Sequence, residues 1–189
     1  MQPEIERELI RKCRGGDARF YEPIVRAYEP QGLRVAMGMM GNPDDARDAL
    51  QDAFVKAFQS LGRFDPDRAF GPWFFQILRN QCRDLLRSRK ARFRVEVVDD
   101  GITEFRSDND DGSFDRRFRR NEARRVLWTA LEKLPEDQRE ILVLKELEGF
   151  RYQEIASILD IPEGTVASRL FHARKGLKEA LDGMGATYP

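Results

Sequence analysis

The chain has 189 residues, 35% of them charged and 41% hydrophobic, which is enough for one ordinary domain or two small ones. Its formal net charge is zero, with 33 basic and 33 acidic residues, and this argues against a protein that coats nucleic acid with its whole surface. Two distant cysteines, one histidine and no apolar run near the ~20 residues of a membrane span exclude a disulfide scaffold, a metal site and direct membrane insertion. We therefore expect a cytoplasmic protein that uses no metal or other cofactor.

The first forty residues are expected to be helical. A short amphipathic helix over residues 4–13 ends at two glycines, and Asp17 is then a good N-cap for the next helix. Pro23 is expected to bend that second helix or to delay its start. A further helical stretch is predicted over residues 33–40.

A longer helix is predicted from Asn42 and Pro43 to about Leu61, because an asparagine N-cap, a proline at the first position and acids in the first turn favour a helix start. Its expected buried stripe is Ala46, Leu50, Ala53, Phe54, Ala57 and Leu61. Its expected outer face is Arg47, Asp48, Gln51, Asp52, Val55, Lys56 and Gln59. A charged face of this kind is usually solvated, but an exposed valine among polar neighbours equally suits a docking surface.

A loop over residues 62–69 leads into a helix predicted over 71–90. If Phe74, Leu78, Cys82 and Leu85 face the core, the opposite face carries Trp73, Gln76, Asn80, Arg83 and Arg87. An indole in line with amides and arginines suits stacking on unpaired bases and tracking of a phosphate backbone. The alternative that Trp73 packs under the preceding loop, with the arginines solvated, stays equally open.

Residues 92–114 are rich in Asp, Gly, Ser and Asn and lack periodicity, so they are expected to form a flexible acidic linker. Basic segments flank it over 83–94 and 116–125, which suggests two modules that face nucleic acid. The 23 linker residues could span at most roughly 75–80 Å. The chain is expected to be helical again from about Asp115, with Val126, Leu127, Ala130, Leu131 and Leu134 on the apolar side.

A helix-turn-helix is predicted within residues 134–181. A short amphipathic helix around Ile155 and Leu159 is broken near Pro162, and a longer helix follows with Val166, Leu170, Ala173, Leu177 and Leu181 on its apolar side. This geometry places a recognition helix in the major groove. The opposite face carries Ser168, His172 and Lys175, with Phe171 on its shoulder and Arg169 and Arg174 on the flanks. These side chains are suited to contacts with base edges and phosphates. They favour a DNA-recognition helix over a helix that is merely solvated on this face.

The C-terminal stretch resembles region 4 of sigma factors of the extracytoplasmic-function (ECF) type, group 4 of the sigma-70 family. The likeness is carried by Leu134-Pro135, Gln138-Arg139, Leu147-Glu148-Gly149, Tyr152-Gln153-Glu154-Ile155-Ala156, Pro162-Glu163-Gly164-Thr165-Val166, Ser168-Arg169-Leu170-Phe171 and Ala173-Arg174. The N-terminal part resembles region 2 of the same family in Asp45-Ala46, Gln51-Asp52, Phe54, Ala57-Phe58, Leu61 to Asp65, Phe70, Trp73, Ile77, Arg79-Asn80, Asp84 and the basic Arg87 to Arg92.

The resemblance implies an all-α fold of two small helical domains, region 2 over residues 1–91 and region 4 over 115–185, joined by the linker over 92–114. It also implies a protein that is not an enzyme and that directs core RNA polymerase to promoters. Region 2 would dock on the polymerase β′ clamp helices through Asp45, Asp48, Gln51, Asp52 and Val55. It would melt the minus-ten element and hold its single strand through Arg63, Phe64, Asp65, Trp73, Gln76, Asn80, Arg83 and Arg87.

Region 4 would read the duplex minus-thirty-five element through Thr165, Ser168, Arg169, Phe171, His172, Arg174 and Lys175, and would bind the β flap on its other side. A spacer of roughly 16–18 base pairs separates the two elements by about 55–60 Å, so the linker is long enough for both domains to bind at once. The family also implies an anti-sigma partner.

The sequence departs from the family pattern at three positions. Ala167 and His172 stand where basic residues are common, which lowers the positive charge of the recognition helix. Asp160 stands where glycine is common, but aspartate tolerates the left-handed conformation. The acidity of the linker suggests a further hypothesis, autoinhibition by masking of the basic faces.

A stand-alone helix-turn-helix regulator is the alternative function, with the N-terminal domain as a dimerisation or sensing module. The Trp73 face argues against it, because a repressor has no use for a platform that holds unpaired bases. An enzyme is disfavoured, since no nucleophile–base pair, phosphate loop or metal cluster is visible.

Overall fold

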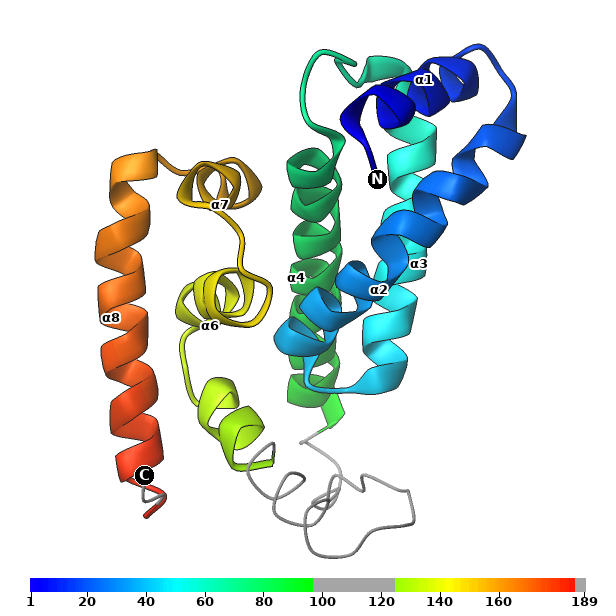
Figure 1. Cartoon of the computed structure of the whole chain (residues 1–189). Helices are drawn as coiled ribbons and strands as arrows, with labels where there is room; N and C mark the ends of the chain where they lie inside the picture. The colour runs from blue at the N-terminus through cyan, green and yellow to red at the C-terminus, as the bar shows by residue number, and fades with distance from the viewer. Residues whose placement is uncertain (97–124, 186–189) are drawn as a thin grey trace, which may run out of the picture.

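The computed structural model describes residues 1–96 and 125–185, and within these ranges all regular structure is helical (Figure 1). The all-α prediction is therefore confirmed. Most of the predicted linker and the helix start expected near Asp115 lie outside the described residues. The main helices are α1 (Pro3–Arg14), α2 (Tyr21–Met40), α3 (Pro43–Ser60), α4 (Phe70–Glu96), α6 (Glu136–Leu142), α7 (Tyr152–Leu159) and α8 (Glu163–Asp182), and residues 125–132 are also helical.

Helix α2 is a single helix, whereas the sequence suggested two stretches with a bend or a delayed start. Pro23 lies in the first turn, where backbone N–H groups have no partner within the helix, so its missing donor costs little. Pro30 lies inside the helix and removes one hydrogen bond. The fully buried Ile24 and Val35 on either side anchor the helix in the core and offset that loss.

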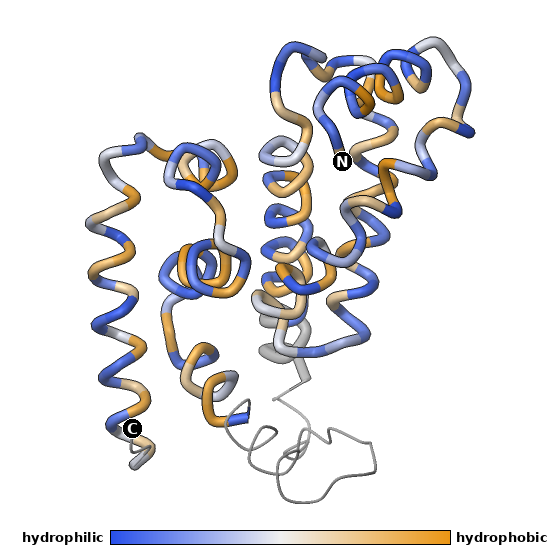
Figure 2. The backbone as a smooth tube through the Cα atoms, viewed as in Figure 1, coloured by the Kyte–Doolittle hydropathy of each residue, from blue (hydrophilic) through white to orange (hydrophobic). Residues whose placement is uncertain are grey.

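The start of α3 follows the prediction. Gly41 ends α2 in the left-handed conformation, with φ of 70°. The Asn42 side chain then accepts hydrogen bonds from the backbone N–H groups of Asp44 and Asp45, at 2.9 and 3.2 Å. All six residues of the predicted stripe are buried, and all seven of the predicted outer face are exposed. In Figure 2 hydrophobic and hydrophilic residues alternate along α3 and α8, as expected of helices that bury one face.

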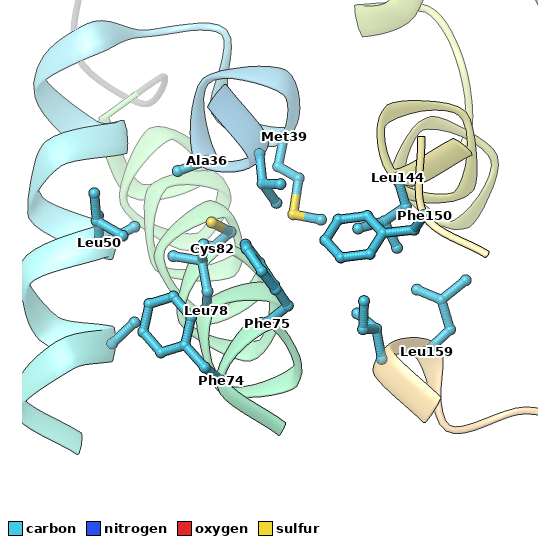
Figure 3. Packing of buried hydrophobic residues seen from close by; sticks show 14 of the residues in the cluster. Ala36, Met39, Leu50, Phe74, Phe75, Leu78, Cys82, Leu144, Phe150 and Leu159 are labelled. Atoms are coloured by element: carbon cyan, nitrogen blue, oxygen red, sulfur yellow. The ribbon is translucent and has the colours of Figure 1, made fainter. Parts of the chain in front are cut away.

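Helices α2, α3 and α4 pack into the N-terminal domain, with α1 across one end (Figure 1). Phe74, Leu78 and Cys82 of α4 point into this core as predicted (Figure 3). The rings of Phe74 and Phe54 stack with centroids 4.6 Å apart. Gly32 allows α2 to approach α3 closely, because a Cβ there would lie 2.6 Å from the side chain of Leu50. Helix α4 continues to Glu96, beyond the predicted end near residue 90.

The C-terminal domain contains the predicted helix-turn-helix. Helix α7 ends at Asp160, which has φ of 54°, and α8 begins one short turn later at Glu163. The backbone N–H groups of Asp160 and Ile161 both donate to the carbonyl of Ala156 and close the turn. The apolar side of α8 is buried at Val166, Leu170, Ala173 and Leu181. The segment Val143–Leu147 (η3), which connects α6 towards α7, is a π-helical turn.

Asp160 gives a test of the turn. A β-branched residue in the left-handed region is strained by about 1–2 kcal/mol, whereas glycine is not. We expect Asp160→Val to lower the free energy of unfolding by about 1–2 kcal/mol and Asp160→Gly to leave it nearly unchanged. Urea denaturation followed by circular dichroism measures both. Equal losses for the two variants would contradict a role for backbone conformation at this position.

The two domains touch. Helix α7 packs on α4, and α6 and η3 pack on α2. At the centre of the contact Phe75 of α4 meets Phe150 edge to face, with ring centroids 4.9 Å apart (Figure 3). One hydrophobic cluster therefore continues from the N-terminal into the C-terminal domain.

Candidate DNA-binding and docking surfaces

The outer face of α8 presents the side chains that the sequence predicted for base recognition. Ser168, His172 and Lys175 are exposed, and Phe171 is 65% exposed. The rings of Phe171 and His172 meet edge to face at 5.5 Å, so the two side chains form a joint aromatic edge. A hydroxyl, an imidazole and an aromatic ring near the start of an exposed helix are suited to hydrogen bonds with base edges and to contact with a thymine methyl.

The flanks of this face carry basic side chains, and an ion pair fixes one of them, Arg174. Both Nε and Nη2 of Arg174 donate to one carboxylate oxygen of Glu146 in η3, at 3.0 and 2.7 Å. This pairing raises the pKa of the Arg174 guanidinium and holds it beside the recognition face. Ser168 donates to the backbone carbonyl of Thr165 at 3.0 Å, and a base contact by its hydroxyl proton would replace that bond. Thr165 and Arg169 are partly exposed.

The second predicted surface begins at the loop before α4. Arg63 and Asp65 are exposed, and the Asp65 carboxylate accepts from the backbone N–H of Asp67, which closes the loop as an Asx turn. Phe64, by contrast, is only 4% exposed and packs against Phe70 and Trp73. Burial gives Phe64 a structural role in this conformation, whereas the sequence suggested a DNA contact.

Trp73 packs under the loop, as one of the two interpretations of its sequence position predicted. Its indole lies 4.6 Å from the ring of Phe64, so it does pack under the loop. It also remains partly exposed. The loop therefore supports one side of the indole while part of the side chain stays accessible to solvent.

The other residues of the predicted face on α4 fall into two groups, some exposed to solvent and one turned towards the C-terminal domain. Asn80 and Arg87 are exposed and Gln76 is partly exposed. Arg83 is turned towards the C-terminal domain, where its guanidinium pairs with the buried carboxylate of Glu140. Arg79, one turn earlier on α4, pairs with the same carboxylate at 2.9 Å. The structure therefore does not bring Arg83 together with the other predicted single-strand contacts.

The predicted docking face on α3 is exposed at Asp48, Gln51, Asp52 and Val55. Val55 is 50% exposed, although it is aliphatic. Asp45 differs from the other four residues, because its partly buried carboxylate forms an ion pair with Arg89 of α4. In this structure Asp45 ties α3 to α4 within the domain.

An open groove of about 590 Å³ lies beside this face, between α2 and α3. Its lining includes Tyr21, Val25 and Leu33 of α2 and Phe58 of α3, none of which was predicted as a docking residue. Phe58 is 40% exposed and its ring lies 5.0 Å from that of Tyr21. An exposed phenylalanine three residues after an exposed valine on one helix is the sequence signal that could have identified the groove.

Burial is the main cause of the raised pKa values of cysteines and tyrosines in the N-terminal domain. Burial, and then the nearby Glu140 carboxylate, raises the pKa of the Cys82 thiol to about 12 from its ordinary value of 9.0. Burial likewise raises the pKa of Cys13, Tyr21 and Tyr28. Among the described residues no group of three His, Cys, Asp or Glu side chains could hold a metal ion. No described helix has the length and apolarity to cross a membrane.

These raised pKa values predict alkaline destabilisation. Between pH 9 and about 12 the Cys82 thiol keeps its proton in the folded chain and loses it in the unfolded chain. The unfolded state therefore binds fewer protons, and the free energy of unfolding falls as pH rises. We expect a lower urea midpoint at pH 10.5 than at pH 8, and a smaller decrease in Cys82→Ala. Equal midpoints at the two pH values would contradict the burial of these groups.

A helix-turn-helix whose second helix exposes a hydroxyl, an imidazole and basic side chains is typical of a DNA-binding protein. Residues 124–177 match the family described as Sigma-70, region 4, and residues 24–92 match Sigma-70 region 2. The RNA polymerase sigma-H factor of Pseudomonas aeruginosa is 32% identical over 182 residues, covering 94% of each chain. The ECF RNA polymerase sigma-E factor of Escherichia coli K12 is 30% identical over 175 residues, covering 89% of this chain and 90% of that one.

Two solved structures are also similar. CnrH in complex with the cytosolic domain of CnrY has a TM-score of 0.70 and 28% identity, covering 95% of this chain and 98% of that chain. The sigma factor RpoE of Bartonella quintana, in complex with the anti-sigma factor NepR, has a TM-score of 0.66 and 26% identity, covering 86% and 96%. The chain belongs to the sigma-70 family of RNA polymerase sigma factors, among those of the ECF type.

Proposed function

We propose that this protein binds core RNA polymerase and directs it to promoters, with region 2 opening and holding the minus-ten element and region 4 reading the minus-thirty-five element. The observation that carries the proposal is that one chain matches both region 2 and region 4, in the family's order. The protein supplies recognition and strand separation, and the polymerase supplies the chemistry. It acts in the cytoplasm, where bacterial promoters and polymerase are.

The recognition face of α8 supports the assignment of the minus-thirty-five contacts. Ser168, Phe171 and His172 face solvent together near the start of the helix, where they can reach base edges. Thr165, Arg169, Arg174 and Lys175 surround them and contact phosphates or base edges at the rim. Because Ala167 and His172 stand where basic residues are common, phosphate contacts contribute less to affinity here than they would with basic side chains at both positions.

The loop and α4 support the assignment of the minus-ten contacts. Holding a strand open requires unstacking of bases, which costs a few kcal/mol, and stacking on an aromatic platform offsets about 1–3 kcal/mol per base. The partly exposed indole of Trp73 is that platform, and Phe64 supports it from below. Arg63, Asp65, Gln76, Asn80 and Arg87 line the path of the strand, and Arg83 joins them when it leaves Glu140.

The α3 face and the neighbouring groove support docking on the β′ clamp helices. Val55 and Phe58 are an apolar centre, and Asp48, Gln51 and Asp52 are a polar rim that bears two negative charges. An apolar centre with a charged rim is the usual anatomy of a protein interface. The predicted contact of region 4 with the β flap remains part of the proposal.

The domain limits proposed are region 2 over residues 1–91, the acidic linker over 92–114 and region 4 over 115–185. Of the two similar solved structures, RpoE is in complex with the anti-sigma factor NepR and CnrH is in complex with the cytosolic domain of CnrY. We therefore include an anti-sigma protein among the expected partners of this chain.

Run-off transcription tests the proposal. Purified core polymerase is supplied with DNA upstream of the protein's own operon, with and without the protein. Specific transcripts that require the protein, and that are lost in Arg169→Ala, are expected. If no transcript forms and the protein alone shifts the duplex, the stand-alone regulator is the correct function instead.

A further inference from the structure

The surface that joins the two domains contains a buried ionic contact. The carboxylate of Glu140 in α6 is 4% exposed and accepts from Nε of Arg79 and from Nε of Arg83, both on α4. One carboxylate of the C-terminal domain thus pairs with two arginines of the N-terminal domain, and the cluster keeps a net positive charge. A second pair joins Arg34 of α2 to the buried Glu148, with bonds of 2.9 Å from Nε and Nη2.

An apolar contact completes the interface. Phe75 and Phe150 bury their rings against each other. Beside them α2 approaches η3 so closely that a Cβ on Gly38 would lie 2.6 and 2.8 Å from the two methyl groups of Val143. The three atoms nearest to that added Cβ all belong to Val143 of the C-terminal domain. The absence of a side chain at Gly38 therefore serves the packing of the two domains against each other.

The polar part of the interface is imperfectly satisfied. Arg139 of α6 donates from Nη1 to the backbone carbonyl of Met39 at 3.2 Å, but its buried Nε has no hydrogen-bond partner in the described part of the chain. A buried unsatisfied donor and buried charges reduce the net stability of a contact. These polar groups weaken the contact between the domains, and relative motion is the default expectation for domains joined in this way.

The packed arrangement is incompatible with the proposed activity. Helix α7 packs on α4, and α8 packs on α6 and α7. At ~8–10 Å for each packed pair of helices, α8 lies roughly 20 Å from α4, far less than the ~55–60 Å between the promoter elements. The Arg83 guanidinium is also unavailable to a DNA phosphate while it pairs with Glu140.

We propose that Glu140 is a phosphate mimic that latches the free protein in a closed conformation, in which region 4 holds Arg83, at the edge of the proposed single-strand surface, together with its neighbour Arg79. Single-stranded DNA and region 4 compete for the Arg83 guanidinium. The domains separate when polymerase and promoter contacts outweigh the latch. The inference rests on the proposed minus-ten surface, and it assigns the inhibitory contact to Glu140 of the folded domain rather than to the acidic linker.

Gly38→Ala tests the latch without removing any charge. The added methyl group clashes with Val143, while alanine favours helix α2, so the domains are expected to separate with each one folded. Small-angle X-ray scattering of the free full-length chain should show a larger radius of gyration. Fluorescence anisotropy with a labelled dT12 oligonucleotide should show binding about 10-fold tighter, since a larger fraction of the molecules is competent to bind.

The double variant Gly38→Ala/Val143→Ala is the matched control. Removing the two methyl groups of Val143 restores the space, so compact scattering and weak dT12 binding should return. If Gly38→Ala alone scatters and binds as the wild type does, or if the double variant stays open, the latch is wrong.

Glu140→Gln tests the ionic part, with Asp137→Asn on the exposed side of the same helix as its control. We expect Glu140→Gln, and not Asp137→Asn, to expand the chain and tighten dT12 binding by about 10-fold. Equal behaviour of the two variants would overturn the role of Glu140. Should Glu140→Gln fail to fold, as circular dichroism would show, the Gly38 pair still decides.

These measurements use the free protein, so they separate two kinds of failure. Absence of run-off transcription by the wild-type protein would sink the proposed function and leave the scattering result standing. Normal transcription together with unchanged scattering of Gly38→Ala would sink the latch alone.

Discussion

Replacement of Val55 by aspartate is expected to weaken binding to core RNA polymerase by about 100-fold. Val55 is half exposed at the centre of the α3 face, beside Phe58 and the groove. An aspartate there would place an unpaired charge at the desolvated centre of the interface, where single substitutions have their largest effects. The fold should be unaffected, because the side chain faces solvent in the free protein.

Competition with a labelled sigma factor for core polymerase measures this effect. Ala27→Asp is the matched control, since it adds the same charge at an exposed position of α2 that does not line the groove. Equal affinities of the two variants would show that polymerase docks on some other face. The groove residues Tyr21 and Leu33 would then need another explanation.

Replacement of Trp73 by alanine is expected to reduce open-complex formation by about 10–100-fold, because stacking of one base on an aromatic ring contributes about 1–3 kcal/mol. Binding of polymerase to the variant should stay unchanged, since the docking face lies on α3. Permanganate reactivity of unpaired thymines in the minus-ten element measures strand opening.

Trp73 also packs against Phe64 and Phe70, so its truncation lowers domain stability as well. Trp73→Phe separates the two effects, because it retains an aromatic face for stacking and fills most of the space. Strand opening by Trp73→Phe should lie close to the wild type. Loss of opening in both variants, each folded at the assay temperature, would contradict stacking as the role of the ring.

The helices of this protein could be predicted because each has a local cause. Asn42 and Pro43 start α3, and Asp160 accepts the left-handed turn before α8. The apolar stripes of α3 and α8 fix their buried faces by period alone. These signals depend on residues close in sequence, and the structure confirms them.

The division of α2 into two stretches was wrong, because the helix continues through Pro30 from Tyr21 to Met40. Ile24 and Val35 of α2 are fully buried, and α2 packs on α3 and α4, so its continuity depends on helices elsewhere in the chain. The predicted end of α4 near residue 90 was also too early, since the helix continues to Glu96. The last turns of α4 are rich in basic residues and have no apolar pattern from which the helix end could be located.

The domain contact could not be predicted from the sequence. A helical wheel of α4 assigns one face to the core and one to DNA, but Phe75 and Arg79 lie on a third face that packs on region 4. Glu140 resembles any other charged residue of a short amphipathic helix until its partners are known. Contacts between residues about sixty positions apart depend on how whole domains pack. The hydrophobic periodicity of the sequence does not predict them.

Footprinting on a promoter upstream of the protein's own operon tests the central claim most directly. The polymerase bound to this protein should protect two patches separated by roughly 16–18 base pairs, about 55–60 Å along the duplex, with reactive thymines in the downstream patch. The free protein at the same concentration should protect neither patch. Equal protection of one duplex site by the free protein, with or without polymerase, would contradict the assignment of this chain as a sigma factor that acts with core polymerase.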